Sequence, residues 1–399
     1  MSDPKPEDTL NRYFIRTAGE SPEGIYRSTV EKGRPLVRAL TSPDIAFASL
    51  PASEAALLRS RGAEVILSRR YEPVASMAAV YSPMAAHPRN QNDVMQHIRA
   101  PQAWTRSRGR DISIAIIDTG VCGTMAEFPS TKKNVTDSWN GVASWTDTIG
   151  HGTMTAAVAA ATSSDGGRYD GVAPDATILA CKTNFDETEL FQIYEHLIGL
   201  IRAGKATRIV TNNSYGMYTC KPLGYAADHP MVQIIREAVS VGIVPVFAAG
   251  NNHVQVCEND PTACEPGTIW GINSLDEVIT VGTVNEAERM DQTAQKPGNY
   301  SHCDSSRGPG ELAQIFTKPD CVAPTYGEVV WGCGYRIMEW WGTSGAAPQV
   351  AGLAALLLSL DQNLTVAEVA ERIRSTCRDV GLGKTCAGSG IIDCEMAVS

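Results

Sequence analysis

The stretch 339-EWWGTSGAAPQVAGLAALLLSL-360 contains the longest apolar run in the chain. From Ala346 to Leu360 nearly every residue is Ala, Leu, Val or Gly, which is typical of a helix that is buried on all sides. Pro348 falls in the first turn of this helix, where its missing N–H costs no hydrogen bond. We therefore predict a core helix over 346–360, too short to cross a bilayer.

Ser344 lies in the Gly-Thr-Ser-Gly turn that precedes this helix. A serine there has two interpretations. It can cap the helix, because Ser and Thr side chains commonly accept the first free N–H groups. It can also be a nucleophile that a tight turn holds at the positive end of the helix dipole. The stretch alone does not decide between them.

The composition is that of an ordinary globular protein, with 399 residues, 43% apolar residues and 20% charged residues. The net charge of −10 disfavours a nucleic-acid partner. The first twenty residues contain no apolar run of the kind found in signal peptides. We expect a cytoplasmic protein without a membrane span, although the sequence leaves secretion by another route open.

The chain has 11 cysteines, an odd number. In a protein expected to stay in the cytoplasm, most of them should be reduced thiols. We expect Cys122 to be a buried structural thiol. The only pairings that the spacing favours are among neighbours in sequence, namely Cys257 with Cys264, and the group of Cys377, Cys386 and Cys394.

From residue 111 onward, short apolar runs alternate with segments of helix length. The runs are continuous rather than alternating, which indicates parallel strands covered on both faces. They are 112–117, 177–181, 208–212, 243–249 and 278–282. The expected helices are 152–162, 187–204, 229–241, 346–360 and 365–376. The sequence predicts an α/β domain with three layers, a parallel sheet with flanking helices.

The N-terminal region has a different pattern, with strands expected at 12–18, 44–50 and 63–70 and a helix at 51–62. These elements predict a small α+β domain. The following segment contains several prolines and no long periodicity, so it is interpreted as a linker. The predicted organisation is a small domain at 1–77, a linker and N-terminal arm at 78–110, and a large domain at 111–399.

Chemically active side chains follow the expected strands of the large domain. Asp118 comes directly after 112–117, Asn251 follows 243–249, and His151 stands at the start of another small-residue helix. In parallel sheets, ligands bind at the carboxyl ends of the strands. With Ser344, these residues are the set that acyl transfer needs: His accepts the serine proton, Asp orients the imidazole, and an amide or backbone N–H stabilises the oxyanion.

The order Asp…His…Ser, with these flanking residues, resembles the subtilisin-like serine peptidases, the subtilases. The matching segments follow the order of that family and cover about 100–399. They are IAIIDTGV (114–121), GHGTMTAAVAA (150–160), GVAPDATILACK (171–182), VFAAGN (246–251), SSRGP (305–309), KPDCVAP (318–324), GTSGAAPQVAG (342–352) and GSGIIDCEMAV (388–398).

The resemblance implies a subtilisin-like fold and a serine endopeptidase that works through an acyl-enzyme. It implies that Asp118 is the triad acid, His151 the base, Ser344 the nucleophile and Asn251 the oxyanion donor. It also implies two substrate-binding walls, and their residues are Ser214, Tyr215, Gly216, Ala248, Ala249 and Gly250.

Three positions depart from the family pattern: Met154 and Gln349 replace the usual histidines, and Gly345 replaces the usual methionine. None of them belongs to the triad. The chemistry requires no cofactor. Because the loop 162–170 does not match the usual calcium loop of the family, a structural calcium ion is undecided and the metal sites are unknown.

Residues 1–77 resemble, more faintly, the inhibitory propeptide of this family. Spacing then predicts a cut near Met77–Ala78. The expected partners are a protein or peptide substrate and the chain's own N-terminal segment as an intramolecular inhibitor. The competing interpretation is a permanent accessory domain.

Two functional alternatives accompany the peptidase. The same acyl-enzyme could be resolved by an amine in peptide maturation or macrocyclisation, for which segment 252–266 is the visible candidate. The fold could also be an inactive binding module, which the complete set of catalytic residue types argues against.

Overall fold

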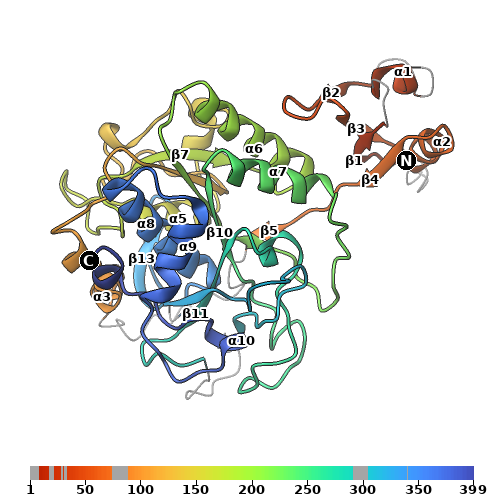
Figure 1. The fold of residues 1–399 in the computed structure, drawn as a ribbon. Helices are drawn as coiled ribbons and strands as arrows, with labels where there is room; N and C mark the ends of the chain where they lie inside the picture. The colour runs from red at the N-terminus through yellow and green to blue at the C-terminus, as the bar shows by residue number, and fades with distance from the viewer. Residues whose placement is uncertain are drawn as a thin grey trace, which may run out of the picture. The chain divides into compact units, whose positions relative to one another are not determined.

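The computed structural model describes residues 9–17, 22–27, 30, 34–73, 89–290, 304–338 and 340–399. The chain forms two compact units (Figure 1). The first unit contains Met1–Tyr71 and Phe185–His196, and the second contains Glu72–Asn184 and Leu197–Ser399.

The second unit is built on a six-stranded sheet in the order β12-β11-β10-β8-β6-β7, in which every neighbouring pair is parallel. This confirms the predicted parallel α/β architecture. The strands are β6 (Ser113–Asp118), β7 (Thr177–Lys182), β8 (Ile209–Asn213), β10 (Val244–Ala248), β11 (Ile279–Val284) and β12 (Cys321–Pro324). The sequence analysis missed β12, because this short strand lies between two prolines that suggest a loop.

The helices of the second unit begin and end close to their predicted limits. They are α5 (His151–Ala160), α7 (Pro230–Ser240), α8 (Thr343–Leu360) and α9 (Val366–Ser375), and α6 (Glu187–Arg202) begins in the first unit and ends in the second. Helices α5 and α8 contact each other and the sheet. Small residues permit this close packing: a Cβ on Gly352 of α8 would lie 2.9 Å from the Ala159 carbonyl oxygen of α5.

Helix α8 is the core helix that the opening stretch predicted. All its residues from Thr343 to Leu358 are buried. At 18 residues, Thr343–Leu360, it is longer than predicted and, in the part of the chain that the structure describes, is the one helix long and apolar enough to cross a bilayer, yet 89% of it is buried inside the fold.

The remaining elements of the second unit are short. A hairpin consists of β13 (Gly327–Trp331) and β14 (Gly334–Met338), and β5 (Glu72–Pro73) pairs antiparallel with β9 (Tyr215–Gly216). The others are α10 (Lys384–Ala387), α11 (Cys394–Ala397), η2 (Ser130–Lys132), η3 (Gly141–Trp145) and η4 (Gly271–Ser274).

The predicted linker contains two helices, α3 (Gln91–His97) and α4 (Ala100–Ala103). Asn90 caps α3 in a reciprocal capping box with Asp93. Pro101, one of the prolines of this segment, occupies the first turn of α4, where proline is tolerated. Within the segment predicted as a linker and N-terminal arm at 78–110, residues 91–97 and 100–103 are therefore helical.

The first unit contains an antiparallel sheet in the order β2-β3-β1-β4. Its elements are β1 (Asn11–Arg16), α1 (Pro22–Arg27), β2 (Leu36–Arg38), β3 (Ile45–Leu50), α2 (Ala52–Ser60) and β4 (Glu64–Leu67). Tyr13 and Ile15 face the core that these helices share, as the two-residue period of a strand requires. On the opposite face, Phe14 lies 5.9 Å from the ring of Phe191 in α6.

The cysteine predictions were wrong for the described residues. Cysteines far apart in sequence form the disulfides Cys122–Cys333, Cys220–Cys257 and Cys264–Cys386. Cys122 is therefore half of a disulfide and not a free thiol. The described residues also include the free thiols Cys181, Cys321, Cys377 and Cys394. Sequence spacing could not predict these pairs, because partners 211 and 122 positions apart are brought together only by the fold.

Neighbouring side chains account for two of the departures from the family pattern. The buried Trp341 side chain occupies the space beside Gly345, where an added Cβ would lie 2.5 Å from the Trp341 Cβ atom. Gln349 donates to the carbonyl oxygens of Pro324 and Gly345, at 2.7 and 2.9 Å. The packing beneath Ser344 is thus adapted to a glycine and a tryptophan.

Gly345→Ala should destabilise the fold, because neither α8 nor the buried indole has room for a methyl group. We expect a loss of about 1–3 kcal/mol in the free energy of unfolding, the usual cost of overpacking. Thermal unfolding in a Ser344→Ala background, which removes the predicted nucleophile, measures it. Gly199→Ala is the matched control: this exposed helical glycine has nothing within 4 Å of an added Cβ, so the control should be neutral or slightly stabilising.

Candidate active site

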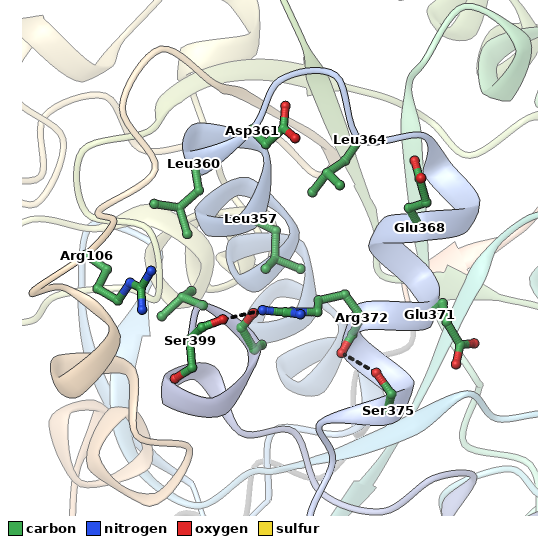
Figure 2. A pocket seen from close by; sticks show the side chains of 12 residues that line it. Arg106, Leu357, Leu360, Asp361, Leu364, Glu368, Glu371, Arg372, Ser375 and Ser399 are labelled. Carbon is green, nitrogen blue, oxygen red and sulfur yellow. Dashed lines mark hydrogen bonds between the residues drawn. The ribbon is translucent and has the colours of Figure 1, made fainter.

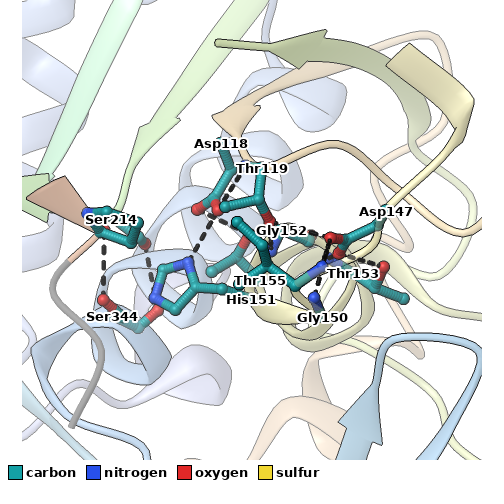
Figure 3. A network of polar contacts seen from close by, with 12 residues as sticks. Asp118, Thr119, Asp147, Gly150, His151, Gly152, Thr153, Thr155, Ser214 and Ser344 are labelled. Carbon is teal, nitrogen blue, oxygen red and sulfur yellow. Dashed lines mark hydrogen bonds and ion pairs between the residues drawn. The ribbon is translucent and has the colours of Figure 1, made fainter. Parts of the chain in front are cut away.

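The fold brings three predicted residues together at one edge of the sheet (Figure 3). Asp118 is the last residue of β6, His151 the first residue of α5, and Ser344 the second residue of α8. All three are fully buried. The Nδ1 atom of His151 lies 2.7 Å from Oδ1 of Asp118, so the carboxylate orients the imidazole.

A second carboxylate, which the sequence analysis missed, fixes the turn before His151. Asp147 accepts hydrogen bonds from the backbone N–H of Gly150 at 2.8 Å and of Thr153 at 2.9 Å, and from the Thr119 hydroxyl at 3.1 Å. The Thr119 oxygen in turn accepts from the Gly152 N–H at 2.8 Å. This network joins the end of β6 to the start of α5. An Asp shortly before a helix start was the available signal.

Ser344 is not a helix cap, which resolves the question that the opening stretch raised. The N-cap of α8 is Gly342, whose φ of 68° suits glycine, and the helix has no side-chain cap. The Ser344 hydroxyl donates to the Ser214 carbonyl oxygen at 3.2 Å. The Ser214 hydroxyl donates to the Ser344 carbonyl oxygen at 3.1 Å, so the two predicted site segments hold each other.

The Nε2 atom of His151 is buried and has no hydrogen-bond partner among the described residues. Because Nδ1 already faces Asp118, Nε2 is the atom that remains to accept or release a proton. A buried nitrogen without a hydrogen-bond partner destabilises the fold. Groups that are left in this state are often those that act on a substrate.

The Asn251 side chain is oriented by Thr343, another residue that sequence reasoning missed. The Asn251 Oδ1 atom accepts hydrogen bonds from the Thr343 N–H at 3.2 Å and from its hydroxyl at 3.0 Å. The amide nitrogen is thereby turned away from Thr343. The Gly250 N–H donates to the same hydroxyl at 3.3 Å. The turn after β10 is thus fastened to the turn that carries Ser344.

The two predicted substrate walls are joined by Asn273, which was not predicted. Its Nδ2 atom donates to the carbonyl oxygens of Tyr215 at 2.7 Å and of Ala248 at 2.9 Å. The strand Tyr215–Gly216 pairs antiparallel with Glu72–Pro73, so an extended segment of the chain already uses this edge. The second wall consists of Ala248, Ala249 and Gly250, and all three are buried.

The segment that follows Asn251 is held by a buried carboxylate. Asp304 accepts hydrogen bonds from the backbone N–H groups of Val254 and Gln255, at 3.0 and 2.9 Å. Burial raises the pKa of Asp304 to about 6, and these two N–H groups oppose that rise. Segment 252–266 is further tied by the disulfides of Cys257 and Cys264.

A cavity of about 670 Å³ lies elsewhere, between the end of α8, α9 and the C-terminal residues (Figure 2). None of the predicted site residues lines it. Within the described ranges, no group of three or more His, Cys, Asp or Glu side chains is arranged to hold a metal ion.

Residues 109–390 match the model of the subtilase family, Peptidase S8. The major intracellular serine protease of Bacillus subtilis is 31% identical over 311 residues, which cover 74% of this chain and 85% of that protein. The leader peptide processing protease EpiP of Staphylococcus aureus has a similar structure, with a TM-score of 0.69, 16% identity, and coverage of 98% and 100%. MycP1 without its N-terminal propeptide gives a TM-score of 0.57, 24% identity, and coverage of 77% and 97%.

The chain therefore belongs to the subtilase family, and it is a subtilisin-like serine endopeptidase. Its substrates are accordingly proteins or peptides. The predicted fold class and family are confirmed.

Asp304→Asn tests the buried carboxyl. The raised pKa means that the folded state binds the Asp304 proton more tightly than the unfolded state does. Protonated Asp304 therefore stabilises the fold below about pH 4, and this stabilisation is lost as the pH rises through about 6. Asn retains an oxygen for both N–H groups and carries no charge. The Tm of Asp304→Asn relative to its Ser344→Ala parent should therefore increase from pH 4 to pH 7.

The exposed Asp165→Asn is the control, and its Tm difference from the parent should not change over that interval. A Tm difference for Asp304→Asn that stays constant with pH would contradict the raised pKa.

Proposed function

We propose that this endopeptidase cleaves peptide bonds through an acyl-enzyme on Ser344. His151 accepts the Ser344 proton at Nε2 as Oγ attacks the carbonyl carbon of the substrate, and then gives that proton to the leaving amine. Water, activated by the same nitrogen, hydrolyses the ester. The observation that carries the proposal is the buried Asp118–His151 hydrogen bond, which leaves Nε2 as the one ring nitrogen able to exchange a proton.

Asn251 and the backbone N–H of Ser344 are the proposed donors to the oxyanion. Thr343 supports this role, because its two hydrogen bonds to Oδ1 fix the orientation of the Asn251 amide before substrate binds. A donor that is already oriented needs no reorganisation when charge develops in the transition state. Ser344 also lies in the first turn of α8, whose dipole favours negative charge.

The proposed substrate is an extended peptide that adds as a strand to Tyr215–Gly216. The pairing of these residues with Glu72–Pro73 supports this mode, because it uses the same backbone groups. Ser214 and Ala248–Gly250 complete the proposed walls. Asn273 keeps the distance between the walls constant through its two hydrogen bonds.

We further propose that residues 1 to about 77 are an intramolecular inhibitor that Ser344 removes. The strand pairing of Glu72–Pro73 supports this, since a segment on that edge excludes substrate. One relative of similar structure, MycP1, has an N-terminal propeptide that was removed for its structure determination. The predicted cut near Met77–Ala78 lies outside the described residues.

Hydrolysis is preferred to the transpeptidase alternative. That alternative rested on segment 252–266, whose two cysteines are accounted for by disulfides and whose turn is held by Asp304. The orientation of Asp118, His151 and Asn251 argues against an inactive binding module.

A cytoplasmic location stays our proposal, with secretion by another route left open, and a relative named as an intracellular protease supports it. The three disulfides weigh against the cytoplasm as the place of action, because disulfides persist in oxidising compartments. Subcellular fractionation tests this proposal.

Asn251→Leu keeps the side-chain volume and removes the donor. We expect kcat to fall about a hundredfold or more, the size known for the loss of one oxyanion donor in this family, with KM little changed. Steady-state kinetics on a chromogenic peptide measure both constants. An effect confined to KM would show that Asn251 binds the ground state instead.

Ser344→Ala should leave the chain at its full 399 residues, whereas the wild type should lose the N-terminal segment. Intact-mass analysis of the two purified proteins compares them. Adding active wild type to the Ser344→Ala variant is the control, since trimming of the variant would reveal a cut between molecules. A full-length and fully active wild type would identify 1–77 as a permanent domain.

A further inference from the structure

The hairpin formed by β13 and β14 is fastened to the segments around His151 at its tip. The disulfide Cys122–Cys333 joins the tip to the loop that follows Asp118. The N–H of Gly332 donates to the carbonyl oxygen of Gly150 at 3.3 Å. A covalent bond and a backbone hydrogen bond thus hold residues 331–334 beside the catalytic histidine.

Trp331, the last residue of β13, contacts the imidazole itself. The two ring centroids are 6.2 Å apart, and the ring planes are nearly perpendicular at 89°. The indole also fills the space beside Gly150, where an added Cβ would lie 2.4 Å from Nε1 of Trp331. Gly150 has a φ of 101°, so both the backbone and the indole require glycine at this position.

The indole reaches the imidazole next to Gly150, the residue that precedes His151. In Figure 3, Ser214 and Ser344 lie on one side of the imidazole, and Gly150, Asp147 and Thr153 lie on the other. The Arg336 guanidinium lies over the indole, 5.3 Å from its centroid, and limits its movement.

A single hydrogen bond does not fix an imidazole completely. The bond from Nδ1 to Asp118 sets the distance of one nitrogen, but the ring can still tilt about that bond and move Nε2 away from Ser344. A bulky ring packed against the imidazole opposes this tilt and keeps water from the polar atoms. A misplacement of about 1 Å in a catalytic group can cost on the order of 10²-fold in rate.

We propose that Trp331 is a positioning residue for His151 and that the Cys122–Cys333 disulfide holds Trp331 in place. This inference rests on the proposed role of His151 as the base. The hairpin continues through the buried Trp340 and Trp341 into the Ser344 turn, so one element connects the base to the nucleophile. No signal in the sequence identified Trp331, because its partner lies 180 positions earlier in the chain.

The test uses the full chain after any self-processing and a peptide p-nitroanilide, which has no residues beyond the cleaved bond. Trp331→Ala should lower kcat by about ten- to a hundredfold and leave KM nearly unchanged. Trp331→Phe should restore most of kcat, because it keeps a ring against the imidazole. Ile337→Ala, an exposed change on the same hairpin, is the control and should keep wild-type kinetics.

The disulfide is tested with paired substitutions. Cys122→Ser with Cys333→Ser should lower kcat in the same direction as Trp331→Ala. Cys264→Ser with Cys386→Ser removes a disulfide outside this hairpin and should lower kcat less than the first pair does. Circular dichroism and Tm in the Ser344→Ala background establish that each variant is folded. If Trp331→Ala does not fold, Trp331→Leu replaces it with the same expectation.

An unchanged kcat in folded Trp331→Ala, or a loss that appears in KM alone, would overturn the positioning role. So would an equal loss in the control cysteine pair. The proposed function is judged separately, by whether Ser344→Ala abolishes hydrolysis of the same substrate. Loss of hydrolysis in Ser344→Ala together with a wild-type kcat in Trp331→Ala would reject this inference and retain the proposed function.

Discussion

The hydrogen bond between Asp118 and His151 is the interaction on which the site depends. Both side chains are fully removed from solvent, and a buried carboxylate is stable only when its surroundings supply hydrogen bonds. The Thr119 N–H donates to Asp118 at 2.7 Å, and the Thr155 hydroxyl lies 3.5 Å from its other oxygen. Low polarity around the pair strengthens its attraction, so the orientation of the imidazole is set before any substrate arrives.

The parallel sheet makes this arrangement available. Because all six strands run in the same direction, the turns after β6 and β10 emerge at the same edge, where α5 and α8 begin. Small residues in both helices let them lie close together, so that the start of α5 places His151 against Asp118 and the start of α8 places Ser344 beside Ser214. Because α8 is buried and rigid, it holds the proposed nucleophile in a fixed position.

Patterns local in sequence predicted the sheet, its helices and the residues at the strand ends, since apolar runs and glycine-rich turns are short-range features. Contacts between distant segments escaped prediction. Thr343, Asn273 and Trp331 act through partners that only the fold brings near, and the same is true of the disulfides. Asp147, strand β12 and the Asn90–Asp93 capping box of α3 were exceptions, since each is a local feature of the sequence and was overlooked.

Labelling with a fluorophosphonate probe tests whether Ser344 is an activated nucleophile, because the probe reacts with a serine only where a base and an oxyanion site are already oriented. The protein should be labelled, digested and mapped by mass spectrometry. We expect a single adduct on Ser344 that disappears in His151→Ala. An adduct on another serine, or labelling of Ser344 that persists without His151, would contradict it.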